Sequence, residues 1–170
     1  MNETKILFRP WDKNDFPHVY DILKKSWDSA YSSFVPKDDL DFYLNQNYNL
    51  SKLEELYNKH SVFCFVAEVD GKAVGWLKLS ISDEEKKNYL SSIYVLPDFQ
   101  KLKIGQRLMT IAFTKAKENG FPDIWIGVME KNIPALEWYK KIGFVFVENL
   151  PFKMGKTTIS HLIGVKEILD

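Results

Sequence analysis

Cysteine and histidine are scarce in this chain of 170 residues, which narrows the classes of site that it can contain. Cys64 is the only cysteine, so no disulfide can form within the chain. A chain of this length buries a core without such bonds, and we expect Cys64 to pack in that core of a cytoplasmic protein. The three histidines, His18, His60 and His161, have no metal-ligand spacing. We therefore expect no metal.

Net charge and long apolar runs are also missing. The 23 basic and 23 acidic residues cancel, which argues against the broad basic surface of a nucleic-acid-binding protein. No apolar run suits a signal peptide or a membrane span, so we expect no membrane partner. No repeat, low-complexity tract or Gly/Ser linker divides the chain. These features predict one globular domain over residues 1–170.

Hydrophobic periodicity predicts alternating strands and helices along this domain. The predicted strands are 5–11, 62–69, 72–81, 89–96, 123–129, 144–150 and 158–168, and the predicted helices are 12–29, 37–47, 50–60, 105–119 and 132–142. Asp12 and Asp15 mark the first helix start, Ser51 the N-cap of the third helix and Asn132 that of the last. Asp70-Gly71 is a two-residue hairpin signal. The order predicts an α/β fold with a mixed, mostly antiparallel central sheet and helices on both faces.

The stretch "YVLPDFQKLKIGQRLM" (94–109) joins a predicted strand to a predicted helix through a short polar loop. Backbone amides of residues 101–106 can converge at the start of that helix, where unpaired N–H groups and the helix dipole favour an anion. The stretch contains one glycine, and neither common glycine-rich phosphate motif is present. On these residues alone, a phosphate loop and an ordinary strand-to-helix turn are equally good interpretations.

A second segment extends the pattern. "SSIYVLPDFQKLKIGQRLM" is followed by "EKNIPALEWYKKIGF", and together they resemble the GCN5-related N-acetyltransferase (GNAT) superfamily. The matching residues are Gln100, Ile104 and Gly105 in the loop, and Asn132, Ala135, Tyr139, Gly143 and Phe144 in the second segment. The block "IWIGVMEKNIPALEWYKKIGF", with "PFKMG" after it, looks most like the polyamine (spermidine/spermine) N-acetyltransferase-like branch. Lys103 stands where the family usually has its first loop glycine.

The resemblance implies a GNAT-type sheet and acetyl-CoA as co-substrate, held where two central strands part. It places the pantetheine arm on Ile93, Tyr94 and Val95, and the pyrophosphate on Gln100, Lys101, Leu102, Lys103, Ile104, Gly105 and Gln106, with Asn132 a further contact. A side chain at Lys103 makes positive φ more costly, so we expect altered loop geometry. Its ammonium, with that of Lys101, can pair with a phosphate of the cofactor.

The resemblance also implies a proton donor. Tyr139 corresponds to the residue that protonates the departing sulfur, although tyrosines on helix faces are commonly packing residues. The family often has a glutamate on the strand at 89–95, and this chain has none there. A water relay to Glu84 or Glu85 is one source of a general base, and a solvated turn is the alternative interpretation of those two residues.

The acceptor is predicted from the first helices. Trp27, Asp28 and Tyr31 are the candidate substrate-binding residues, with Phe34, Asp38 and Asp39 nearby. Acidic and aromatic groups together suit a cationic amine, which makes a polyamine the favoured acceptor. A peptide N-terminus and an aminoglycoside stay as alternatives. The missing glutamate and Lys103 also leave open a non-catalytic acyl-CoA-binding regulatory module, and a homodimer is left open.

Overall fold

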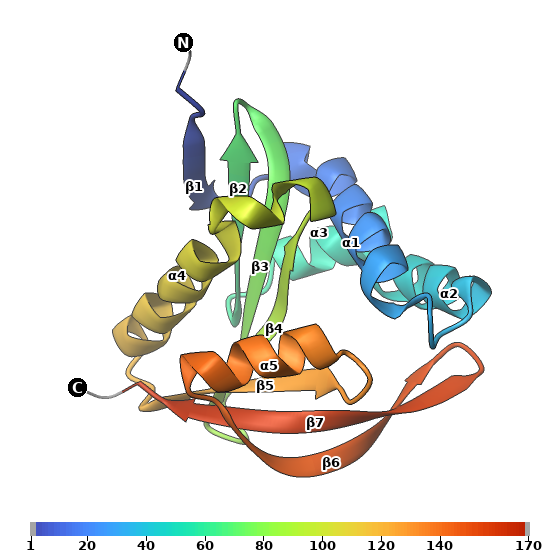
Figure 1. The fold of residues 1–170 in the computed structure, drawn as a ribbon. Helices are drawn as coiled ribbons and strands as arrows, with labels where there is room; N and C mark the ends of the chain where they lie inside the picture. Colours follow the sequence, from blue (N-terminus) through green and yellow to red (C-terminus); the bar gives the residue numbers. More distant parts are fainter. Residues whose placement is uncertain (1–2, 169–170) are drawn as a thin grey trace.

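A computed structural model describes residues 3–168 of the protein (Figure 1). Its strands are β1 (Ile6–Pro10), β2 (Val62–Val69), β3 (Lys72–Ser82), β4 (Lys87–Val95), β5 (Asp123–Met129), β6 (Val145–Met154) and β7 (Thr157–Glu167). Its helices are η1 (Lys13–Asp15), α1 (Phe16–Tyr31), α2 (Lys37–Asn47), α3 (Leu50–Tyr57), η2 (Pro97–Leu102), α4 (Ile104–Glu118) and α5 (Ile133–Ile142). No helix in the described range is long and apolar enough to cross a bilayer.

The strands form one seven-stranded sheet in the order β1-β2-β3-β4-β5-β7-β6. Neighbouring strands are antiparallel except β4 and β5, which run parallel. Helices α1 and α4 lie on opposite sides of the β2–β4 region, and α5 lies over β5 (Figure 1). The predicted α/β class, with its mostly antiparallel sheet covered on both faces, is confirmed.

Local sequence signals explain most element boundaries. The carboxyl group of Asp15 accepts from the backbone N–H of Asp12 as part of the predicted capping box. The prediction that Ser51 caps α3 is wrong, because the side chain of Asn49 accepts from the backbone N–H of Lys52 at 3.0 Å. The amide oxygen of Asn49, two residues earlier, caps a free N–H group of the first turn, and the helix starts at Leu50.

Strand β6 is longer than the sequence predicts. It continues to Met154 because residues 151–154 pair with the start of β7, including Pro151 opposite Ser160. Pro151 is compatible with this position because β6 is an edge strand. The result is a long β6–β7 hairpin whose tip reaches the region of α2 (Figure 1).

The core fills both faces of the sheet. On the α4 face, Gly75 lets the helix come close: a Cβ there would lie 3.2 Å from the Cβ of Ala67 and 3.4 Å from Ile104 Cγ2. Trp76, next in the strand, is fully buried, and its ring contacts Tyr48 on the other side, 6.1 Å between centroids. Successive side chains of β3 point to opposite faces of the sheet, so this one strand contributes to the core on both faces.

The parallel pair β4–β5 is interrupted soon after it begins. A register shift between Lys78 and Leu79 of β3 leaves Ser91 of β4 as an extra residue, which is a β-bulge. Strand β4 is matched with β5 at Tyr89 opposite Trp125, and no later residue of β4 is paired with β5 in the described structure. The two strands therefore separate from residue 90 onward and leave one edge of β4 unpaired.

Charged groups join β1, β2 and the start of α1. Arg9 donates to both carboxylate oxygens of Asp15, at 2.7 and 2.8 Å, and to Glu68 at 2.9 Å. Burial alone would raise the pKa of Asp15, but hydrogen bonds from Arg9 and from the Asp12 backbone hold it below its usual value. Since the folded-state pKa is depressed, this carboxylate stabilises the fold above its unfolded pKa and loses that contribution as pH falls through the folded value.

We predict that Asp15→Asn lowers the free energy of unfolding by about 1–3 kcal/mol at pH 7. The difference from the wild type should shrink as the pH falls from about 4 through the lower folded-state pKa of Asp15, below which both chains lack the carboxylate. Urea unfolding at several pH values measures this. Asp21→Asn, which removes an exposed pair with Lys25 at 3.0 Å, is the control and should cost under about 0.5 kcal/mol. Equal losses for both variants would contradict the prediction.

Candidate active site

A cleft of about 820 Å³ opens where β4 and β5 separate. Its walls come from α1, the second half of β4, the start of α4, the end of β5 and the first turns of α5. Segments from residue 26 to residue 139 therefore meet around one space. This cleft is the candidate active site.

The start of α4 forms one end of the cleft. Lys103, Gly105 and Gln106 line it, and the N–H groups of the first helical turn have no partner within the helix. Lys103 takes the left-handed conformation, with φ 59° and ψ 24°, so the lysine occupies the backbone geometry that favours glycine. The corner is suited to an anion because free N–H groups and a lysine converge on it.

Three predicted loop residues lie differently. Lys101 and Leu102 are exposed and do not line the cleft, while Ile104 is fully buried against β3. Their side chains are therefore not at the anion corner. Any contribution from their backbone N–H groups to a bound pyrophosphate stays a prediction.

The unpaired edge of β4 forms the floor. Ile93, Tyr94 and Val95 all line the cleft, as the prediction of a pantetheine site requires. The side chain of Gln100 donates to the carbonyl of Val95 at 3.2 Å, so this residue braces the end of β4. Asn132 also lines the cleft, and its side chain makes no capping hydrogen bond to α5. Asn132 therefore occupies the predicted N-cap position, but its side-chain amide is not used by the helix.

Three tyrosines, Tyr31, Tyr94 and Tyr139, also line the cleft. The hydroxyl oxygens of Tyr31 and Tyr94 are 3.1 Å apart, and Tyr139 is buried, with its ring 5.5 Å from that of Phe144. Burial raises the pKa of Tyr31 to about 12 and is the main cause that raises the pKa values of Tyr94 and Tyr139 as well. All three phenols are therefore neutral at pH 7 and act as proton donors rather than bases.

The predicted acceptor residues divide into two groups. Tyr31 lines the cleft, and Trp27 lies behind it, with ring centroids 6.4 Å from Tyr31 and 6.3 Å from Tyr94. Asp28 is outside the lining. Asp39 is engaged elsewhere, because it accepts from the backbone N–H of Lys156 at 2.9 Å at the β6–β7 tip. Neither carboxylate lies in the cleft.

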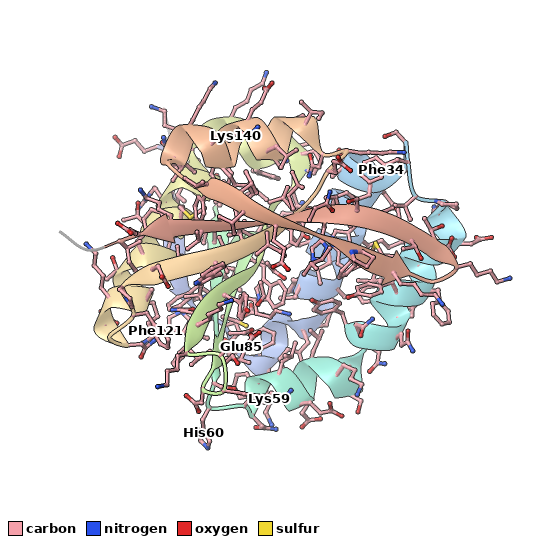
Figure 2. All side chains as sticks on the ribbon, turned by 90° about the horizontal axis from the view of Figure 1, so that it is seen from below. Phe34, Lys59, His60, Glu85, Phe121 and Lys140 are labelled. Carbon is pink, nitrogen blue, oxygen red and sulfur yellow. The ribbon has the colours of Figure 1, made fainter. Side chains whose placement is uncertain are left out.

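A base is missing from the lining itself. The described lining residues include no aspartate, glutamate or histidine. Glu84 and Glu85 lie in the exposed β3–β4 turn, where Glu85 accepts from the hydroxyl of Tyr89 at 2.6 Å. Figure 2 shows Glu85 well away from Phe34, which lines the cleft. The solvated-turn interpretation therefore describes these glutamates better than a relay does.

Sequence reasoning missed other lining residues. Trp138 covers the start of α4, its ring 3.7 Å from where a Cβ on Gly105 would lie, and Lys131 adds a second ammonium to the cleft. Ser26 of α1 has a buried hydroxyl with no hydrogen-bond partner in the described structure. Trp138 directly precedes Tyr139, so the second family segment already contained this residue and could have indicated it. Nothing in the local pattern distinguished Ser26.

Comparison with known proteins identifies the fold family. The model of the Acetyltransferase (GNAT) family matches residues 16–144. The chain belongs to this family. This GNAT protein is thus an acetyl-CoA-dependent acyltransferase, and it carries both family segments within the matched range. No group of three metal-ligating side chains occurs among the residues that the structure describes.

Individual relatives agree with this placement. An uncharacterized N-acetyltransferase of Lactobacillus delbrueckii subsp. lactis is 26% identical over 150 residues, which are 84% of this chain and 86% of the relative. An N-alpha-acetyltransferase of Sulfurisphaera tokodaii is 31% identical over 118 residues, 63% of this chain and 71% of the relative. The crystal structure of the PaiA N-acetyltransferase of Thermoplasma acidophilum with coenzyme A has a TM-score of 0.83 at 20% identity, covering 96% of this chain and 99% of that chain.

We predict that Lys103→Gly stabilises the protein but weakens coenzyme A binding. Glycine relieves about 1 kcal/mol of left-handed strain, whereas loss of the ammonium should raise the Kd for coenzyme A about fivefold. Lys103→Gln is the matched control, since it removes the charge and keeps the strained backbone. Thermal unfolding and calorimetric titration measure the two effects. Unchanged coenzyme A affinity in both variants would show that the ammonium does not reach a phosphate.

Proposed function

We propose that this GNAT protein transfers the acetyl group of acetyl-CoA to a primary amine by direct attack within a ternary complex. The observation that supports this most directly is a single cleft lined by two kinds of donor. The start of α4 has N–H groups without a partner in the helix, and three neutral phenols also line the cleft. A phosphate-bearing acyl donor fits between them, and its reactive end would lie beside the phenols.

Acetyl-CoA would supply an activated acyl group as a thioester. The start of α4, with Lys103, would hold the pyrophosphate, and the free edge of β4 at Ile93–Val95 would hold the pantetheine amides as an added strand does. Asn132 is placed to donate from the opposite wall. These contacts fix the reacting carbon near α1 without using any carboxylate.

Tyr139 is the proposed donor to the departing sulfur. Its phenol is neutral at pH 7 and lies in a buried position in the cleft wall. A thiolate leaving group is protonated best by a donor that is already in place. The neighbouring pair Tyr31–Tyr94 offers further hydroxyl groups for the acyl oxygen or the attacking nitrogen.

We predict that Tyr139→Phe lowers kcat about 10²-fold and leaves the Kd for acetyl-CoA within about twofold. Phenylalanine keeps the ring contacts with Trp138 and Phe144, so the fold and the binding surface should persist. Thiol release and calorimetry measure these quantities. Tyr57→Phe, outside the cleft, is the control. A fully active Tyr139→Phe enzyme would return Tyr139 to a packing role.

The acceptor is proposed to be a small cationic amine such as a polyamine, held by the aromatic wall of Tyr31 and Phe34. Aromatic faces attract ammonium groups without a carboxylate. A second candidate is the α-amino group of a peptide. It is supported by the absence of carboxylates from the described lining, and by the relative named N-alpha-acetyltransferase. An α-amine has a lower ordinary pKa than an alkylamine and is neutral more often at pH 7.

An acceptor panel separates these proposals. We expect thiol release from acetyl-CoA to depend on added amine, and the panel compares spermidine, a peptide with a free N-terminus and an aminoglycoside. Saturation by spermidine alone would support the polyamine, and saturation by the peptide alone the α-amine. Tight binding of acetyl-CoA without acceptor-dependent release would instead support a non-catalytic acyl-CoA-binding module. Homodimer formation and a cytoplasmic location stay predictions.

A further inference from the structure

The wall of the cleft is open at Gly127, and an imidazole lies directly behind it. Gly127 of β5 is exposed and lines the cleft. A Cβ built on it would lie 3.0 Å from Cδ2 and 3.5 Å from Nε2 of His161 on β7. Because glycine has no side chain, nothing from this residue separates the ring from the cleft. We propose that His161 is the general base of the acetyl transfer, an inference that rests on the proposed function.

The hydrogen bonding of His161 fixes which ring nitrogen can accept a proton. Its Nδ1 lies 2.8 Å from the carbonyl oxygen of Leu150. A carbonyl oxygen only accepts, so Nδ1 carries the hydrogen in the neutral ring. The lone pair is then on Nε2, the nitrogen on the Gly127 side. An imidazole held in this way is preset as a base, because the backbone orients the ring and selects its tautomer.

Aromatic contacts place His161 on the α1–α2 side of the sheet, where the acceptor is proposed to enter. The chain of contacting rings runs from His161 to Phe152 (5.2 Å), Tyr43 (5.5 Å), Trp27 (5.8 Å) and Tyr94 (6.3 Å). The last of these lines the cleft. Packed aromatic rings therefore connect the imidazole to Tyr94 in the cleft lining.

The hairpin that carries His161 is anchored at its far end. Asp39 of α2 accepts from the backbone N–H of Lys156 and from the hydroxyl of Thr157, next to Gly155, whose φ is 59°. A side chain at Gly155 would collide with Asp39. This contact holds the tip of the β6–β7 hairpin against α2, and the strand that carries His161 is thus anchored at its start.

Titratable groups around His161 come from three directions. Glu148 and Lys153 are on β6, Glu130 and Lys131 follow β5, and Tyr43 and Asp39 are on α2. None of them forms a hydrogen bond or ion pair with His161 in the described structure. None of these charged groups therefore occupies the ring nitrogen that would take the proton of the acceptor.

The proton steps balance with His161 and Tyr139 together. Nε2 takes one proton from the acceptor ammonium, directly or through one water, and leaves a neutral amine. The amine nitrogen forms a bond to the acetyl carbonyl carbon, and the carbon–sulfur bond breaks with its electron pair on sulfur. Tyr139 gives its phenolic proton to that sulfur and regains the second proton lost by the nitrogen. His161 then releases its proton to water.

The test replaces His161 with asparagine, whose side-chain N–H₂ can keep the bond to Leu150 while removing the base. We expect kcat/KM at pH 7 to fall about 10²-fold, and the Kd for acetyl-CoA to stay unchanged. The rise of activity with pH should move toward the ordinary pKa of the acceptor amine. Added imidazole should restore part of the rate. His60→Asn, at the exposed position seen at the edge of Figure 2, is the control and should match the wild type.

The variant Gly127→Ala tests the same proposal a second time while His161 stays intact. Its methyl group would enter between the ring and the cleft, 3.0 Å from Cδ2, so we expect lower kcat with the KM for acetyl-CoA little changed. A His161→Asn enzyme with wild-type kcat/KM and pH profile would overturn the proposal while the acetyltransferase assignment stands. A wild-type protein that acetylates no amine in the panel would overturn both.

Discussion

The loss of pairing between β4 and β5 is the constraint on which the other features of the site depend. Parallel strands normally continue to exchange hydrogen bonds along their length. Here the bulge at Ser91 bends β4 away after its one matched position with β5. The separation creates the cleft and at the same time leaves β4 with unused backbone donors and acceptors. A ligand rich in amides can take the place of the missing strand.

The electrostatics of the cleft come from dipoles and lysines rather than from carboxylates. The start of α4 supplies partial positive charge, Lys103 adds a full charge next to it, and Lys131 adds another to the cleft lining. The phenols in the lining are neutral at pH 7, and burial raises their pKa values further above the ordinary value. Such a cleft suits an anionic acyl donor, but its lining cannot deprotonate an ammonium. The proposed base, His161, is outside the lining and lies next to the glycine at position 127.

The acceptor side is assembled from segments far apart in the chain. Asp39 of α2 holds the tip of the β6–β7 hairpin, across 117 residues of sequence to Lys156. Tyr43 of α2 also packs against Phe152 of β6, which adds a second contact between this helix and the hairpin. The same hairpin carries His161. The contacts of Asp39 and Tyr43 with the hairpin therefore also help to position the imidazole ring. Packing and proposed chemistry on this side share one set of interactions.

Much of the protein follows from local sequence. Alternating apolar residues, the Asp12–Asp15 capping box and the Asp70-Gly71 turn determine most elements to within a few residues, since these signals act over short distances. The two family segments located Tyr139 and the loop before α4. The sequence could not show that Asp39 binds the β6–β7 hairpin or that Asp28 lies outside the cleft. A sequence pattern identifies an aspartate, but it does not show whether the carboxylate contacts solvent, backbone or substrate. For His161 the sequence indicated only that it has no metal-ligand spacing to another histidine. Its relation to Gly127 exists only where β5 and β7 pair, and strand register depends on the whole sheet.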